Sequence, residues 1–173
     1  NIKSASVDII NNFNVGAISV EDIKVNNVPD KKLKVINVVD GTLVSDKILV
    51  DASTENEEVI SDLDSDILKI VLHNRYTNMP VQVGFIKGFG LKKGAFASSV
   101  SHDSHNILAI GTNDNDIVSV VNKIVEAKGG LAVSCQDMSD ILELPIAGLM
   151  SDKDINTISD SYSRLKYKLK EFD

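Results

Sequence analysis

The sequence predicts an α/β domain of the α+β kind, in which helices flank a mixed β-sheet and a short β-hairpin or linker segment comes first. Short β-branched runs bounded by turn residues occupy much of the chain before residue 112. Two longer stretches beyond that point repeat apolar residues at helical spacing. A helix followed by a strand, after a series of strands, indicates layers of both kinds of element.

The first elements follow a polar stretch. Residues 1–32 contain paired asparagines and little pattern, so we expect a linker or remnant segment there and the domain proper over residues 33–173. That domain opens with LKVINVV, a β-branched run that ends at the turn dipeptide Asp40-Gly41, and ILV at residues 48–50 resumes it. The two runs predict a hairpin.

Four more apolar runs predict strands in the middle of the chain. They are ILKIVLHNRY at residues 67–76, VQVGFIKGF at 81–89, AFASSV at 95–100 and NILAIG at 106–111. The first of them is apolar through most of its length, as a strand covered on both faces is.

Two helices are predicted in the last third of the chain. The first begins at the capping residues Asn113 and Asp114 and ends at a Gly-Gly pair. Residues 130–135, GLAVSC, then form a strand. Ser151 is expected to cap the last helix, which carries lysines near its end, as the helix dipole favours.

Composition narrows the class of protein. Apolar residues make up 43% of the chain and charged residues 25%, as in a soluble globular domain. The net charge of −7 disfavours nucleic acid as a partner. No apolar run reaches the roughly 20 residues that span a bilayer, so we expect no membrane segment and a cytoplasmic protein. The single cysteine, Cys135, agrees with a reducing compartment.

The stretch SSVSHDSHN, at residues 98–106, concentrates chemically capable side chains between two predicted strands. A metal site would use His102 and His105, but no carboxylate cluster is placed to complete it. A hydrolytic triad would need a serine, a histidine and Asp103 to converge, which neighbours in sequence rarely do. On residue types alone, a hydrogen-bonded polar turn is favoured.

Two other stretches resemble ligand-binding loops but match their patterns only in part. GFGLKKG, at residues 88–94, lacks the order of a phosphate-binding loop and does not lead into a helix, so it predicts a turn between strands. Asp62, Asp64 and Asp66 alternate as calcium ligands do, yet the glycine and closing glutamate of a calcium loop are missing. We interpret these aspartates as a solvated acidic linker.

Taken together and in order, these motifs resemble the C-terminal region of bacterial and archaeal adenine deaminases, members of the amidohydrolase superfamily. The resemblance runs from about residue 33 to the end, and it is carried by GFGLKKGA, SHDSHN and LPIAGLMS. It implies hydrolysis of adenine to hypoxanthine and ammonia in purine salvage. It also implies an upstream barrel domain, absent here, that holds manganese or iron to activate water.

The resemblance also implies site residues. His102, Asp103, His105 and Asn106 match the family's HDSHN and are candidates to support the active site. The candidates for substrate binding are Arg75, Lys87 and Ser99. Tyr76 stands where the family pattern has histidine after the arginine. No metal or cofactor is expected within this chain.

Two functions from different classes remain open at this point. The chain is either the C-terminal domain of an adenine deaminase, inactive alone, or a non-catalytic binding or oligomerisation module. The expected partners are the upstream barrel, adenine as the substrate of the whole enzyme, and further copies in a homo-oligomer. An independent hydrolase built on SHDSHN is the weakest reading.

Overall fold

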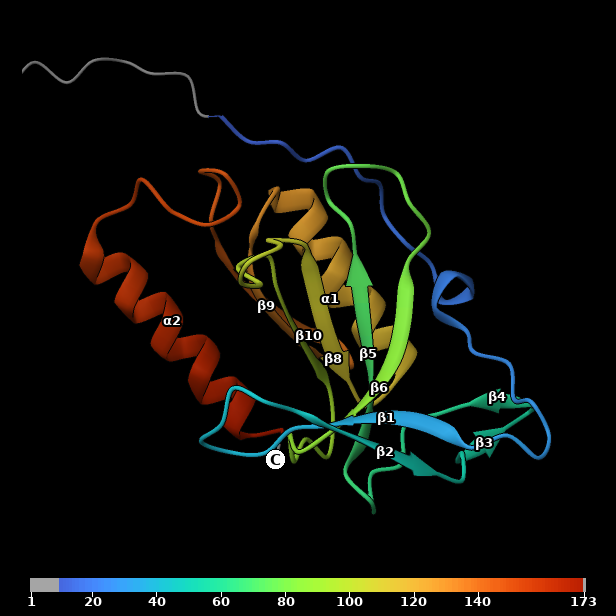
Figure 1. The fold of residues 1–173 in the computed structure, drawn as a ribbon. Coiled ribbons are helices and arrows are strands. Elements are labelled where there is room, and N and C mark those ends of the chain that lie inside the picture. Colours follow the sequence, from blue (N-terminus) through green and yellow to red (C-terminus); the bar gives the residue numbers. More distant parts are fainter. Residues whose placement is uncertain (1–9, 173) are drawn as a thin grey trace, which may run out of the picture.

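A computed structural model describes residues 10–172, and this part of the chain folds around one large β-sheet (Figure 1). The helices are the 3-10 helix η1 Val20–Ile23 and the α-helices α1 Asp114–Ala127 and α2 Ile155–Lys170. The strands are β1 Leu33–Asn37, β2 Asp46–Val50, β3 Thr54–Glu55, β4 Glu58–Val59, β5 Ile67–His73, β6 Gln82–Lys87, β7 Ala95–Ser98, β8 Ile107–Gly111, β9 Gly130–Cys135 and β10 Met138–Glu143.

Eight of these strands form the sheet in the order β10-β9-β7-β8-β5-β6-β1-β2, and β3 and β4 pair separately. Seven strand pairs join the eight; β1 with β6 is parallel and the rest are antiparallel. The expected mixed sheet with flanking helices is therefore confirmed. The predicted hairpin is also confirmed, because β1 and β2 pair antiparallel across the turn at Asp40 and Gly41.

The two α-helices cover opposite faces of the sheet. On one face, Ile117, Val121 and Ile124 of α1 pack onto small residues such as Ala95 and Ala109. These alanines let the helix approach closely, which gives the face dense packing. On the other face, α2 lies over β9 and β10, and its contacts form a second apolar cluster. The sheet is thus the central layer, with α1 and α2 on either side (Figure 1).

The helix starts test the predicted caps. The Asn113 side chain accepts a hydrogen bond from the Asp116 N–H at 2.9 Å, so the first cap is confirmed. The second prediction, Ser151, is wrong, because Asp154 caps α2. Its carboxylate accepts from the N–H groups of Asn156 and Thr157, which a side chain three residues earlier does not reach.

One strand of the main sheet was not predicted. β10, with the sequence MSDILE, mixes polar and apolar residues and has no turn signal as strong as Asp-Gly before it. Its pairing with β9 over six residue pairs stabilises it as a strand, although its own sequence pattern does not predict one. The short pair β3 and β4 was missed for the same reason.

The start of the described chain packs onto the domain. Ile18 and Ile23 are buried in the cluster under α1, and the Asn122 side chain exchanges hydrogen bonds with the backbone of Ile18. The predicted linker covers residues 1–32, of which residues 1–9 lie outside the described residues. Its boundary with the domain at residue 33 stays a prediction.

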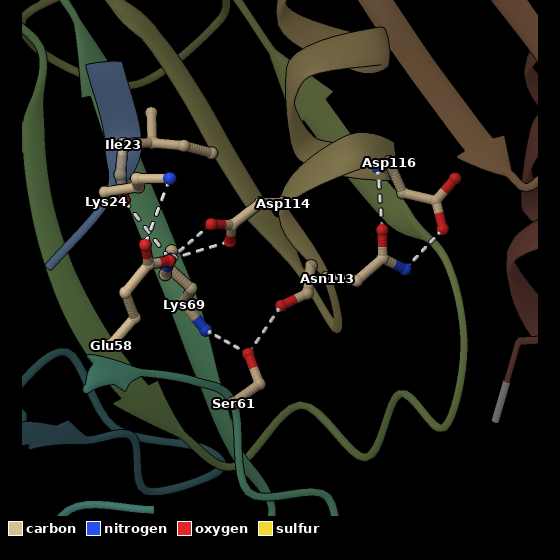
Figure 2. Close-up of polar contacts among 9 residues, drawn as sticks. Ile23, Lys24, Glu58, Ser61, Lys69, Asn113, Asp114 and Asp116 are labelled. Carbon is tan, nitrogen blue, oxygen red and sulfur yellow. Dashed lines mark hydrogen bonds and ion pairs between the residues drawn. The ribbon is translucent and has the colours of Figure 1, made fainter. Parts of the chain in front are cut away.

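A buried ion pair fixes the N-terminal end of α1 (Figure 2). Lys69 of β5, only 3% exposed, lies 2.7 Å from the Asp114 carboxylate and also donates to the carbonyl of Ile23. The Lys69 N–H donates to the hydroxyl of Ser61. Lys69 therefore connects β5, α1 and η1. Among the described residues, no helix has the length and apolar character needed to cross a membrane.

Candidate functional site

The polar loop SSVSHDSHN lies at one end of the sheet, between β7 and β8. His73, the last residue of β5, pairs with Ile107, the first residue of β8. Arg75 is two residues further along the chain, so strand register brings it to the same end as the loop. We call His73, Arg75 and residues 99–106 the polar end of the sheet; it is at the top of Figure 1.

Within the loop the two histidines differ. The His102 side chain is 86% exposed, and its Nδ1 lies 2.7 Å from the Asp103 carboxylate. His105 is half-buried and has a φ of +52°, in the left-handed region that residues with a side chain rarely adopt. The His105 N–H donates to the Ser101 carbonyl at 2.6 Å, and the centroids of the two imidazole rings are 6.5 Å apart.

The serines of this stretch bind backbone groups. The Ser98 hydroxyl accepts from the Val100 N–H, and the Ser104 hydroxyl accepts from the Asn106 N–H. Among the described residues, none of these hydroxyls hydrogen-bonds to a histidine. The geometry is that of a polar turn, as the residue types favoured, and a hydrolytic triad is not assembled.

Buried polar atoms without a hydrogen-bond partner gather at this end of the sheet. Within residues 10–172 they are Asn11 Oδ1, His73 Nδ1, Arg75 Nε and Nη1, His105 Nδ1 and Asn106 Oδ1. The Asn11 amide donates to the carbonyls of Lys128 and Pro145, which follow α1 and β10 at the same end. Folded proteins pair nearly all such groups with protein atoms, ordered water or a bound ligand, so further partners are expected at this end of the sheet.

Arg75 is the most unusual of these residues. It is 3% exposed, and its guanidinium lies between the rings of Phe13 and Tyr76, with centroid distances of 5.1 and 4.7 Å. Its Nη2 donates a hydrogen bond to the Tyr76 hydroxyl at 3.0 Å. Gly148 lies against the guanidinium so closely that a Cβ there would be 2.1 Å from Nη1.

Of the other two predicted substrate-binding residues, Lys87 lies away from the polar end and Ser99 lies within it. Lys87, at the end of β6, pairs with Ile67 at the start of β5, and so belongs to the opposite end of the sheet from His73. Ser99 is fully buried, and its hydroxyl donates to the Gly148 carbonyl at 2.6 Å and accepts from the Gly130 N–H at 2.8 Å. Through these two hydrogen bonds the Ser99 hydroxyl connects the polar end to the backbone at Gly130 and Gly148.

The glycine-rich loop is also at the opposite end. The Asp66 carboxylate accepts from the N–H groups of Gly88 and Gly90, and the Lys92 N–H donates to the Phe172 carbonyl. The predicted turn between strands is confirmed. The interpretation of the aspartates as a solvated linker needs correction, since Asp66 uses both oxygens to hold this loop.

Metal ligation finds no support in the described residues. Within residues 10–172, no three histidine, cysteine, aspartate or glutamate side chains are grouped closely enough to hold a metal ion. His102 and Asp103 are a pair without a third ligand. The expectation that this chain holds no metal stays a prediction.

Two residues at this end of the sheet, His73 of the polar end and Asn11 beside it, were missed from the sequence. His73 stands in an apolar strand, and a lone histidine there was the only signal. Asn11 lies in a weakly patterned stretch, and its long-range contacts have no local signature. Both join the site only through the tertiary fold.

The fold and this site define an α+β domain with a polar end formed by loops from distant parts of the chain. Residues 42–172 match the family described as adenine deaminase C-terminal domain. The chain belongs to this family, as the resemblance in its motifs implied.

Curated relatives agree with the family match. An adenine deaminase of Parabacteroides distasonis is 44% identical over 160 residues, covering 92% of this chain and 29% of that protein. One of Methanosarcina barkeri is 46% identical over 162 residues, covering 90% and 29%. One of Salinibacter ruber is 38% identical over 165 residues, covering 95% and 30%. The chain therefore spans less than a third of the length of these relatives.

Proposed function

We propose that this chain works as the C-terminal domain of an adenine deaminase, which hydrolyses adenine to hypoxanthine and ammonia in the cytoplasm as part of purine salvage. The support is the family match and the relatives named adenine deaminase, of which the chain covers under a third. The remaining length is where we place an amidohydrolase barrel. Manganese or iron held there would supply an activated water.

We assign no step of that metal chemistry to the described residues, because they hold no fitting ligand set. Their contribution is at the polar end of the sheet. The observation that carries this assignment is the gathering of unpartnered buried groups there: Arg75, His105 and Asn106 have donors or acceptors left over. We propose that the polar end faces the barrel and completes the binding of adenine or the ordering of metal-bound groups.

The roles within the polar end divide by exposure. His102 and Asp103 are exposed enough to meet the barrel directly, whereas His105 and Asn106 are half-buried behind them. Ser99 positions the loop through its backbone hydrogen bonds. Lys87 is left without a role at this site because of its place at the other end of the sheet.

The decisive experiment follows ammonia release from adenine, with manganese added, by this chain alone and after mixing with the separately expressed barrel segment. We expect activity only on mixing, because the metal-bearing segment is needed to activate water at neutral pH. Activity of the chain alone would place the chemistry in SHDSHN and overturn the proposal.

The role of the loop is tested with His105→Ala in the same mixture. We expect kcat to fall by about tenfold or more, in the range that positioned hydrogen-bonding groups contribute, while the circular dichroism spectrum stays unchanged. Asp137→Ala, at an exposed residue between β9 and β10, is the matched control and should keep full activity. Unchanged kinetics for His105→Ala would make the loop a structural turn only.

A further inference from the structure

Arg75 is a buried cation that no carboxylate of the described chain balances. Its side chain is 3% exposed, yet none of the ion pairs within residues 10–172 includes it. Nη2 donates to the Tyr76 hydroxyl, whereas Nε and Nη1 are buried without a hydrogen-bond partner among these residues. Arginine keeps its charge in proteins, so it does not escape the cost of burial by losing a proton. A buried charge of this kind needs a counterion.

The groups that the structure places against the Arg75 guanidinium are neutral. They are the rings of Phe13 and Tyr76 and the backbone of Gly148. The Gly148 carbonyl accepts from the Ser99 hydroxyl. Adenine is uncharged at neutral pH, so the substrate in the function proposed above does not supply the missing charge either. We therefore look for the counterion outside the described residues.

Arg75 lies where the beginning of the described chain enters the domain (Figure 1). The Asn14 N–H donates to the Arg75 carbonyl at 2.7 Å, and the Ala147 N–H donates to the Ile10 carbonyl at 3.1 Å. Residues 10–14 therefore run along the polar end. The matching family is described as a C-terminal domain, and the chain covers 29% of the Parabacteroides distasonis relative. A preceding segment would thus join the domain beside Arg75.

Exposed apolar side chains lie on the loops of the same end. Met79 is in the β5–β6 connection, Val100 is in the β7–β8 loop, and Met150 is in the segment between β10 and α2. Ile10 is 80% exposed, Met79 and Met150 are each 55% exposed, and Val100 is 39% exposed. Protein interfaces combine apolar contact area with arginine anchors at their centre, and this end of the sheet has both.

We propose that a carboxylate side chain of the barrel segment pairs with Arg75, and that the exposed apolar side chains at this end pack against the same segment. The inference rests on the function proposed above, in which the polar end faces the barrel. A carboxylate fits because the guanidinium fork donates hydrogen bonds to both of its oxygens. Phe13 and the loop that carries Gly148 now enclose the unpartnered nitrogens, so one of them shifts when the carboxylate enters.

This assignment gives Arg75 opposite effects in two settings. In the chain alone it is an uncompensated buried charge and costs stability. In the whole protein its ion pair fixes how the two parts dock. The tests measure both effects.

The first test is urea unfolding of the 173-residue chain alone, at one protein concentration. Arg75→Met should leave the midpoint unchanged or raise it, because an unpaired charge is removed while an apolar side chain still contacts the two rings. Arg164→Met is the matched control, at the only other arginine of the sequence. It should lower the midpoint, since Arg164 donates two hydrogen bonds to Asp140.

The second test measures hydrogen exchange over residues 98–107 in the full-length deaminase that carries this domain. Exchange there should be slower than in the chain alone, because the barrel segment covers the polar end. Arg75→Met should speed exchange at least about tenfold, since docking loses its ion pair. Arg75→Lys keeps the charge and should speed it less. Lys93→Met removes an exposed charge from the glycine-rich loop at the opposite end and should have no effect.

The partner carboxylate is identified by double-mutant cycles in the full-length protein. Each aspartate or glutamate of the barrel segment is changed to its amide, alone and together with Arg75→Met. Substitution of the true partner should speed exchange in the wild-type background and add nothing in the Arg75→Met background.

Four outcomes overturn the inference. A midpoint that falls as much for Arg75→Met as for Arg164→Met would show that Arg75 is already paired within the chain. Stabilisation of the wild-type chain, but not of Arg75→Met, by added acetate would assign Arg75 to a free anion. Slow exchange in the full-length protein that Arg75→Met leaves unchanged would remove this inference and leave the proposed function intact. Equal exchange in the full-length protein and in the chain alone would remove the proposed placement of the polar end as well.

Discussion

At the scale of single residues, Lys69 is a side chain through which three elements contact one another. It is 3% exposed and joins β5 to Asp114 of α1 and to the carbonyl of Ile23 in η1 (Figure 2). Replacing one partner of a buried pair leaves the other charge without compensation, which costs far more than the pair itself is worth. The cost of losing Lys69 therefore comes mainly from the uncompensated charge of Asp114, and less from the lost attraction between the two groups.

We predict that Lys69→Met lowers the free energy of unfolding by about 3 kcal/mol. The measurement is urea denaturation at pH 7. The double variant Lys69→Met, Asp114→Asn should recover much of the loss, since the orphaned carboxylate is then gone. Lys32→Met is the control: its pair with Asp51 is exposed at both ends, so the change should be below about 1 kcal/mol. Equal losses for Lys69 and Lys32 would contradict this account.

At the scale of elements, α2 is held by its cap and by a carboxylate on the neighbouring strand. The cap is Asp154, whose side chain accepts from two backbone N–H groups. We predict that Asp154→Ala lowers the unfolding free energy by about 1 kcal/mol and reduces helicity. Ser151→Ala should change it by less than about 0.5 kcal/mol, as surface substitutions do. Thermal unfolding followed by circular dichroism distinguishes the two residues, and a larger effect at Ser151 would restore the cap predicted from sequence.

The second tie is Asp140 of β10, whose carboxylate accepts two hydrogen bonds from Arg164 and one from Lys168. The hydrogen bonds from Arg164, and then that from Lys168, hold the pKa of the Asp140 carboxyl well below its usual range. In the unfolded chain the pKa of that carboxyl is about 3.9. The unfolded state therefore binds the proton more tightly, and the stabilisation is complete above that pH and is lost as the pH falls below it.

We predict that Asp140→Asn lowers the unfolding free energy at pH 7 by about 1–2 kcal/mol, since hydrogen bonds to charged groups are lost. The difference from wild type should shrink as the pH falls from about 4 toward 2. Asp137→Asn, at an exposed carboxylate in the β9–β10 turn, is the matched control. The measurement is urea unfolding across this pH range, and a difference that stays constant with pH would contradict the assignment.

At the scale of the whole molecule, sequence reasoning succeeded where the signal is local. Asn113 and the apolar spacing that follows it define α1 without reference to the rest of the chain. β10 was not predicted because its stability comes from pairing with β9. Asp154 was not predicted as the cap because Ser151, three residues earlier, has a side chain of the same capping class. The site divides in the same way.

The residue types of the polar loop were visible in sequence, whereas their companions were not. Strand register decides that His73 and Arg75 lie beside the loop and that Lys87 lies at the far end. A one-residue or one-strand change in pairing would have assembled a different site from the same residues. Register is a property of the whole sheet, so no single stretch of sequence predicts it.

The distribution of buried residues predicts how the molecule opens. α1 has five buried residues, whereas α2 has one, Leu165. Because segments with few buried contacts open locally before the core does, we predict that the amides of α2 exchange with solvent through a lower-energy opening than those of α1, β5 and β8. The measurement is native-state hydrogen exchange at low denaturant. Equal protection of α1 and α2 would show that the few contacts of α2 suffice to make it part of the global unfolding unit.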